Sequence, residues 1–448
     1  MDGVLRLYDV ETARRTILRR RPVGQVTPSP ALQAGIEARF GEPLSPEEAV
    51  ARILADVRER GDAALRDWTA RLDGARLERF AVPREAWRAA WEGLDPALQD
   101  ALRLAADRIR AFHQQEPLHS WLSWSAEGSA LGQRIVPLRR VGVYVPGGTA
   151  PLPSTLLMSV IPARVAGVEE IVVATPPGGD GEVAPVILAA AHLAGVTALY
   201  RLGGAQAVAA LAYGTESVPA VDKVVGPGNL FVTLAKRQVF GQVGIDGLPG
   251  PTETMVIADE TARPAWVAAD LLAQAEHDVL ATAILLTPHR PLAEAVQREV
   301  ARRLEALSRA EIIARSLTGQ GGIVLVRDLD EAVALANRYG AEHLCLAVAD
   351  PWALAGRVHN AGGLFLGEHS FEVLGDYVAG PTHVMPTMGT ARFASPLTVR
   401  DFVKVISLFA LSPAEAIRLS GPAARLAEAE GLTAHAAAAR LRCGESSV

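Results

Sequence analysis

The segment from Ala269 to Asp278 gathers hydrogen-bonding side chains where an apolar stretch stops. Its sequence, Ala-Asp-Leu-Leu-Ala-Gln-Ala-Glu-His-Asp, predicts a helix that ends in a polar cluster. Gln274 and His277 stand three positions apart, so on a helix both side chains leave the same face, one turn from each other. An imidazole beside an amide oxygen can form half of a metal site or half of an acid/base pair. Both kinds of chemistry stay open at this point.

Acidic residues accompany other histidines as well. The pairs are Glu342 with His343, Asp376 with His383, and Glu430 with His435. The two cysteines, Cys345 and Cys443, are far apart and outside any motif, which excludes a thiolate zinc knuckle and argues against a disulfide scaffold. Any metal would therefore be held by nitrogen and oxygen ligands, an arrangement typical of catalytic zinc.

The bulk properties are those of a globular enzyme. A chain of 448 residues exceeds one ordinary core, so two or more domains are expected. The hydrophobic content of 49% and charged content of 21% are typical of soluble proteins. A net charge of −6 without a long basic run gives little support for binding to nucleic acid or a membrane surface. Because there is no signal sequence and no bilayer-spanning apolar run, we expect a cytoplasmic location.

The first 115 residues are predicted to be mainly helical. A short helical arm covers residues 1–25 and is rich in arginine: Arg14, Arg15, Arg19, Arg20 and Arg21. A solvated helix face is the simpler interpretation of this cluster, and a phosphate contact is the alternative. A capping box at Ser45 and Glu48 then begins a run of helices that continues with breaks to about Gln115.

From Leu131 onward, strands alternate with helices. The predicted strands are 141–145, 171–174, 198–202, 254–258, 283–287, 322–326 and 344–348, each followed by a Gly-rich turn or a helix. This alternation predicts an α/β fold with two Rossmann-like domains and parallel sheets. We assign 26–143 with 252–397 to a first, discontinuous α/β domain and 144–251 to a second, NAD-binding one. The segment 398–448 is predicted to be a helical, Ala-rich tail without strands.

The usual dinucleotide fingerprint, Gly-x-Gly-x-x-Gly, is absent. Three strand-to-helix turns are rich in glycine instead, at 141–148, 202–207 and 225–230. Turns at the carboxyl ends of parallel strands converge on one crevice, where Tyr144, Gln206 and Asn229 would supply a ring and two amides. Each turn alone is explained by tight chain reversal, but the three together favour a cofactor cleft.

Several motifs together resemble the histidinol dehydrogenases. They are Tyr-Val-Pro-Gly-Gly (144–148), Gly-Gly-Ala-Gln-Ala (203–207), Val-Asp-Lys-Val-Val-Gly-Pro-Gly-Asn (221–229), Leu-Leu-Ala-Gln-Ala-Glu-His (271–277), Gly-Asp-Tyr-Val-Ala-Gly-Pro-Thr-His-Val-Met-Pro-Thr (375–387) and Glu-Gly-Leu-Thr-Ala-His (430–435). The resemblance covers nearly the whole chain. It implies a four-electron, NAD-dependent oxidation of L-histidinol to L-histidine through bound L-histidinaldehyde, the last step of histidine biosynthesis.

The same resemblance implies roles for particular residues. It places the ligands of one Zn2+ per subunit on Gln274, His277, Asp376 and His435. It places the acid/base pair on Glu342 and His343, and the NAD+ contacts on Tyr144, Gln206 and Asn229. Substrate contacts fall on Thr252, His343, His383 and Glu430, along with the four metal ligands. It also implies a homodimer with exchanged tails, in which Glu430 and His435 serve the partner's site.

Other functions remain open beside this one. The chain departs from the family's usual residues at Thr252, Ala341, Cys345 and Thr382. A paralogue with the same machinery could oxidise another small alcohol, such as 2,3-dihydroxypropane-1-sulfonate. A zinc hydrolase could use the same acids and histidines but leaves the three glycine turns unexplained. A silent binding protein fits poorly with an adjacent Glu342 and His343.

Overall fold

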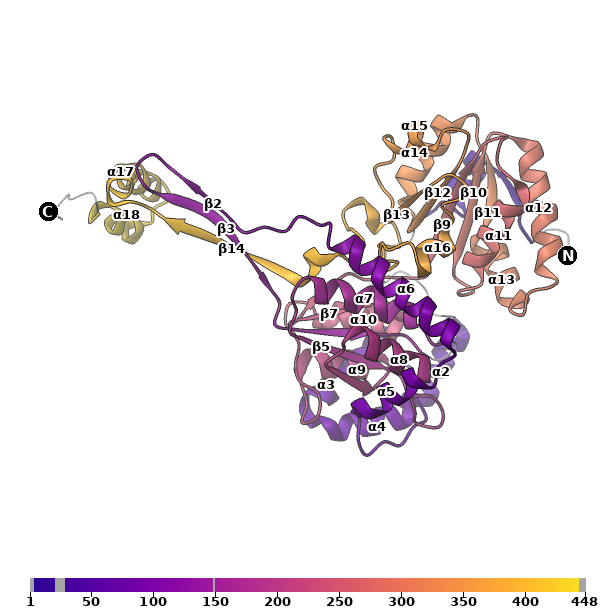
Figure 1. Cartoon of the computed structure of the whole chain (residues 1–448), viewed down its shortest axis with the longest axis horizontal. Coiled ribbons are helices and arrows are strands. Elements are labelled where there is room, and N and C mark those ends of the chain that lie inside the picture. Colours follow the sequence, from indigo (N-terminus) through magenta and orange to yellow (C-terminus); the bar gives the residue numbers. More distant parts are fainter. Residues whose placement is uncertain (1–3, 21–28, 148–149, 443–448) are drawn as a thin grey trace. The chain divides into compact units, whose positions relative to one another are not determined.

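The computed structural model describes residues 4–20, 29–147 and 150–442 (Figure 1). Arg21, Gly148 and Cys443, named in the sequence analysis, lie outside these ranges. The chain divides into two units. Unit 1 contains the residues up to Gln115 and Leu138–Phe402, and unit 2 contains Glu116–Pro137 and the chain from Val403 onward. Within the described residues, no helix combines the length and apolar character needed to cross a bilayer.

Unit 1 contains a six-stranded, fully parallel sheet in the order β1-β11-β10-β9-β12-β13. Its strands are β1 (Leu7–Asp9), β9 (Glu253–Ala258), β10 (Thr282–Thr287), β11 (Gly322–Leu325), β12 (His343–Ala347) and β13 (Gly363–Leu366). Successive residues of a strand point to opposite faces, and here both faces are covered. Val256 and Leu285 pack with α11 (Pro264–Ala275), α12 (Arg290–Leu304) and α13 (Ala310–Gln320). Met255 and Ile284 pack with α1 (Val10–Arg15), α14 (Leu329–Tyr339) and α15 (Pro351–Ala355).

Unit 1 also contains a five-stranded parallel sheet in the order β6-β5-β4-β7-β8. Its strands are β4 (Arg140–Tyr144), β5 (Glu170–Thr175), β6 (Ala198–Arg201), β7 (Lys223–Val225) and β8 (Gly244–Ile245). One face is covered by α5 (Arg84–Glu92), α6 (Pro96–His113), α7 (Pro153–Val165) and α8 (Pro185–Ala194). The other is covered by α3 (Pro46–Arg60), α4 (Asp62–Leu72), α9 (Gly204–Tyr213) and α10 (Leu230–Val239).

The two parallel sheets confirm the predicted α/β fold, but the assignment of 26–143 to the first domain is wrong for most of that segment. Helices α3 to α6 bury their apolar faces in the two cores of the five-stranded sheet. There α3 packs on α9 and α10, α5 packs on α8, and α6 packs on α7. The predicted arm is also not purely helical, because β1 forms the edge of the six-stranded sheet. An amphipathic helix shows that it has a buried face, but not which sheet it covers.

Unit 2 corrects the prediction of a strandless tail. It holds an antiparallel sheet in the order β14-β3-β2, with β2 (Trp121–Trp124), β3 (Ala130–Pro137) and β14 (Val403–Ala410). Helices α17 (Pro413–Ala429) and α18 (Thr433–Arg440) follow, packed through small residues such as Ala424, Ala427 and Ala436. Most side chains of β14 are exposed, so the strand lacks the buried apolar run that identifies the strands of the parallel sheets.

Candidate active site

The predicted catalytic residues meet at the amino ends of β9 and β12 in the six-stranded sheet. The register pairs His343, the first residue of β12, with Thr254 of β9. Thr252 directly precedes β9, and Gln274 lies in the last turn of α11, which contacts α16 (Glu372–Tyr377). Four separate stretches of sequence therefore bring their polar side chains to the same end of the sheet.

The ring of His343 is buried and set to accept a proton. Its Nδ1 lies 3.2 Å from the carbonyl oxygen of Glu253, so in the neutral ring Nδ1 carries the hydrogen and donates it. Its Nε2 has no hydrogen-bond partner among the described residues and lies 3.7 Å from Oδ1 of Asp376. A buried nitrogen with a free lone pair is the group that a general base needs.

Glu342 lies beside this ring, and its carboxylate is held by two donors. Thr252 Oγ1 donates to Oε2 at 2.6 Å, and the backbone N–H of Glu253 donates to the same oxygen at 3.1 Å. Burial raises the pKa of Glu342 to about 7. A carboxylate with such a pKa can take up and release a proton near neutrality.

The amide of Gln274 joins this group from α11. Its oxygen accepts from the N–H of Glu253 at 2.8 Å, and its nitrogen donates to the carboxylate of Glu372. Glu372 is buried, accepts from Thr254 Oγ1 and has Oε1 at 3.6 Å from His343 Nδ1. Burial raises the pKa of Glu372 well above its usual range.

Sequence reasoning missed Glu372, although a signal was present. It stands four positions before Asp376, so both side chains leave the same face of a helix. Glu253, whose backbone contacts both members of the acid/base pair, and Thr155 were also missed. Their contacts join segments far apart in the sequence, which no local pattern records.

His383 is fixed at both ring nitrogens. Nδ1 lies 2.8 Å from the carbonyl oxygen of Asp376, and Nε2 lies 3.1 Å from Oγ1 of Thr155 on α7. Burial lowers the pKa of His383, so the ring is held neutral. His277, beyond the end of α11, lies at the solvent-exposed rim, where partial desolvation lowers its pKa and the charge of Asp376 opposes that shift.

The residues predicted to hold zinc fit a nitrogen and oxygen site in their chemistry. Among the described residues, no three His, Cys, Asp or Glu side chains are placed to hold one ion. The predicted set supplies only two such side chains in unit 1, His277 and Asp376, which are electrostatic neighbours. Its third member is the amide of Gln274, and its fourth, His435, is in unit 2. The chemistry of this donor set suits zinc, and the assignment of these residues as metal ligands stays a prediction.

The predicted NAD+ contacts lie at the carboxyl ends of strands in the other sheet. β4 and β7 are neighbours from which the chain proceeds in opposite directions, which makes their junction a topological switch point. Gly226 follows β7 with φ 108°, and a Cβ there would approach the carbonyl oxygen of Tyr144 to 2.2 Å. The turn thus requires glycine and leaves its backbone close to β4.

Each of the three side chains already has partners in the protein. The hydroxyl of Tyr144 accepts from the N–H of Gly204 at 3.1 Å. Gln206 donates to Asp73 at 3.0 Å, and its own Oε1 is buried without a partner among the described residues. Asn229 is exposed and caps α10. Tyr144 and Gln206 therefore stabilise the turns through buried hydrogen bonds, while Asn229 is exposed at the N-terminus of a helix.

The tail residues lie within unit 2. Glu430 ends α17, His435 lies in α18, and both side chains are exposed. They flank the turn between the two helices, so they could serve one site together.

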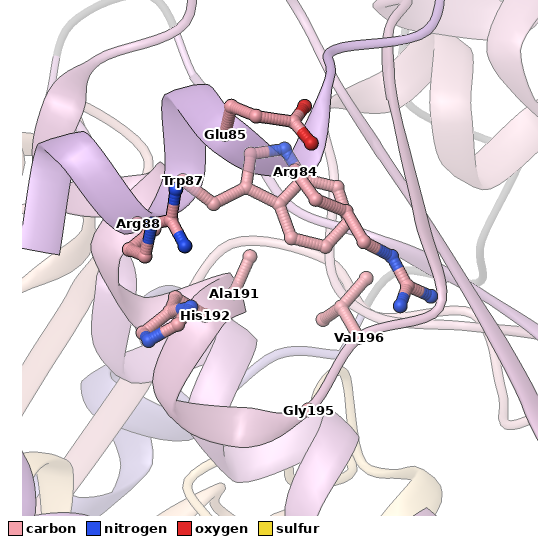
Figure 2. Close-up of a pocket in the computed structure, with 8 residues that line it drawn as sticks. All are labelled: Arg84, Glu85, Trp87, Arg88, Ala191, His192, Gly195 and Val196. Atoms are coloured by element: carbon pink, nitrogen blue, oxygen red, sulfur yellow. The ribbon is translucent and has the colours of Figure 1, made fainter.

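A surface cavity of about 300 Å³ between α5 and α8 has no part in the candidate site (Figure 2). It is lined by Arg84, Glu85, Trp87, Arg88, Ala191, His192, Gly195 and Val196. Arg84 donates to the carbonyl of Thr197 (2.8 Å), and Arg164 donates through Nε to that of Gly195 (3.0 Å). Cations at the end of α8 complement the negative end of a helix dipole, which gives this charge a structural role.

Two parallel sheets, with Glu342 and His343 buried side by side at the end of one of them, are typical of an α/β enzyme. Residues 42–443 match the family model described as histidinol dehydrogenase, and the chain belongs to that family, as its motifs predict. It is 56% identical over 425 residues to the histidinol dehydrogenase of Deinococcus radiodurans, covering 94% of this chain and 96% of that protein. It is 55% identical to that of Thermus thermophilus, covering 90% and 97%. The crystal structure of histidinol dehydrogenase from Elizabethkingia anophelis superposes with a TM-score of 0.90 at 32% identity, covering 99% of both chains.

Proposed function

We propose that this protein oxidises L-histidinol to L-histidine with NAD+, through L-histidinaldehyde held in the site. The observation that carries the proposal is the unpartnered Nε2 of His343, beside a Glu342 carboxyl whose pKa is about 7, in a chain 56% identical to a histidinol dehydrogenase. The substrate of the sulfonate paralogue is not favoured by these relatives. The cytoplasm stays the predicted location of a biosynthetic enzyme of this kind.

The first oxidation needs a base for the hydroxyl proton. His343 Nε2 takes this proton while its Nδ1–H stays on the Glu253 carbonyl, so the ring does not turn during the transfer. Nearby Asp376 stabilises the imidazolium that results. When bound, NAD+ accepts the hydride and Zn2+ holds the imidazole and amine of the substrate.

The second oxidation needs a water molecule at the aldehyde carbon. Glu342 takes a proton from this water as it adds to the carbonyl carbon, and the imidazolium of His343 returns its proton to the carbonyl oxygen. The neutral His343 then takes the hydroxyl proton of the hydrate. In sum, one histidinol, one water and two NAD+ give one histidine, two NADH and three protons. The two side chains thus divide the work between carbonyl hydration and alcohol deprotonation.

The zinc ion is assigned to Gln274, His277, Asp376 and, from a second subunit, His435. Thr252, His383 and Glu430 would orient the substrate, with Thr252 also holding Glu342. For NAD+, the β4–β7 junction with Asn229 at the start of α10 would supply the binding surface, while Tyr144 and Gln206 hold the turns in place.

A homodimer with exchanged tails is part of the proposal. Unit 2 exposes large apolar side chains, among them Trp121, Leu122, Trp124, Val405 and Phe409. A surface of this kind commonly marks a protein interface, and a second copy of the chain would cover it. The exposed Glu430 and His435 would then complete the site of the partner.

A stoichiometric assay tests the function. The purified enzyme with Zn2+ and NAD+ is supplied with limiting L-histidinol, and NADH is followed to completion. Two NADH per histidinol and free histidine are expected. No NADH from histidinol, or NADH only from 2,3-dihydroxypropane-1-sulfonate, would reject the assignment in favour of the paralogue.

A further inference from the structure

Arg20, which the sequence analysis interprets as part of a solvated face, is turned inward in the structure. Its guanidinium forms a bidentate ion pair with Glu253, with Nη2 at 2.8 Å from Oε2 and Nη1 against Oε1. Nε donates to the carbonyl of Tyr339 at 2.9 Å, and Nη2 donates to that of Gly340 at 3.1 Å. The guanidinium also stacks 3.4 Å above the centre of the Tyr339 ring. One side chain of the N-terminal arm therefore holds several segments together.

The partner of Arg20 is the residue that touches both members of the acid/base pair. The backbone N–H of Glu253 donates to Glu342, and its carbonyl oxygen accepts from Nδ1 of His343. Its carboxylate is only 4% exposed and also accepts the N–H of Met388 at 3.0 Å. Met388 has φ 56°, the one positive φ of a non-glycine residue in the described chain. The hydrogen bond from Met388 to Glu253 is therefore formed at a cost in backbone conformational energy.

We propose that Arg20 is a positioning residue for the reaction: it fixes Glu253, and Glu253 sets the ring of His343 and the carboxylate of Glu342. The inference rests on the proposed function for its assay. It adds to the site a part of the chain that lies before residue 42, where the match to the family model begins. Without Arg20 the buried Glu253 carboxylate loses its counter-charge, and its backbone no longer holds the two catalytic groups in place.

The test compares Arg20→Ala and Arg20→Lys with Arg19→Ala, which alters the exposed neighbour of Arg20. Steady-state kinetics with histidinol gives kcat and KM separately, and circular dichroism reports folding. For Arg20→Ala we expect kcat to fall about 10-fold or more with KM nearly unchanged, as for a group that orients catalytic residues. Arg20→Lys keeps the charge but not the planar fork, so an intermediate kcat is expected. Arg19→Ala should match the wild type.

Chemical rescue separates positioning from simple stabilisation. Millimolar guanidinium chloride, far below denaturing concentrations, should restore part of the kcat of Arg20→Ala and leave Arg19→Ala unaffected. An unchanged kcat in Arg20→Ala, or a loss confined to KM, overturns the proposal. If Arg20→Ala does not fold, Arg20→Lys decides by the same kcat criterion. Wild-type protein that is inactive with histidinol would instead reject the proposed function.

Discussion

Glu342 and His343 are adjacent at the start of β12, but their surroundings differ and suit different proposed tasks. His343 has one nitrogen on a backbone carbonyl and the other without a partner among the described residues, so the carbonyl selects which tautomer the neutral ring adopts. Glu342 has its carboxylate on a hydroxyl and an N–H, and burial raises its pKa to about 7. Each side chain can therefore act as a base in its own step.

Glu342→Gln should affect the second oxidation more than the first. The amide keeps the size of the side chain and can still accept from Thr252, but it cannot take a proton from water. Oxidation of histidinaldehyde should slow by about 100-fold, within the range for loss of a general base, while histidinol oxidation to the aldehyde keeps most of its rate. The two steps are measured separately by supplying either substrate. Equal losses in both would contradict the division of roles.

The pH dependence of the aldehyde step follows from the same carboxyl. Because burial raises the pKa of Glu342 to about 7, the ionised form that accepts a proton is gained as the pH rises through that value. The rate of aldehyde oxidation in the wild type should therefore rise between about pH 6 and 8. In Glu342→Gln this rise should be absent; if it persists unchanged, another group controls it.

At the scale of elements, the sequence best predicted the strands whose two faces are both buried. Strands such as β9 and β10 are continuous apolar runs between turns, and their observed bounds lie close to the predicted ones. The short edge strands β1 and β13, of three and four residues, are not fully buried and were missed, as was the exposed β14. The candidate site shows the same division. The family motifs identified Glu342 and His343. The contribution of Glu253 and Arg20 could not be predicted, because it depends on a contact between distant segments.

Helix α6 carries an ionisable group that should make the fold sensitive to acid. His113 is 1% exposed, neither ring nitrogen has a partner among the described residues, and burial lowers its pKa to about 4. The unfolded chain binds a proton near pH 6.5 and the folded chain only near 4, so stability falls as the pH drops through this window. The linkage amounts to at most about 3 kcal/mol.

His113→Leu should remove that acid sensitivity. Urea unfolding at pH 7 and pH 4 measures the change in the free energy of unfolding, with His359→Leu, which alters an exposed histidine, as the matched control. The variant should lose less stability on acidification than the wild type, and the control should behave like the wild type. Equal acid losses in all three proteins would show that His113 is not responsible.

The turn after β7 should depend on the absence of a side chain. Gly226→Ala places a Cβ 2.2 Å from the Tyr144 carbonyl oxygen at a φ of 108°. A loss of about 3 kcal/mol of stability is expected, together with weaker NAD+ binding. Gly247→Ala is the control, because its Cβ would meet no heavy atom within 4 Å. Thermal unfolding and titration with NAD+ measure both effects, and a neutral Gly226→Ala would contradict the close packing.

At the scale of the whole molecule, the proposed exchange of tails makes a prediction about mixed subunits. His343→Ala and His435→Ala should each be inactive alone. If His435 serves the partner, a hybrid dimer holds one complete site, so an equal mixture after subunit exchange should recover roughly a quarter of wild-type activity. If each tail serves its own subunit, the mixture stays inactive. The assay is NADH formation from histidinol, with dimer formation checked by light scattering.

Unit 2 is built from two distant segments of the sequence, which has a consequence for folding during synthesis. β3 pairs with β14 along its whole length, yet β14 begins only at Val403. During synthesis on the ribosome, β2 and β3 must therefore wait, with one edge of β3 unpaired, until almost the entire polypeptide has emerged. Unit 2 is accordingly the last region to mature, and the nascent protein is most open to aggregation or chaperone capture through this unfinished hairpin.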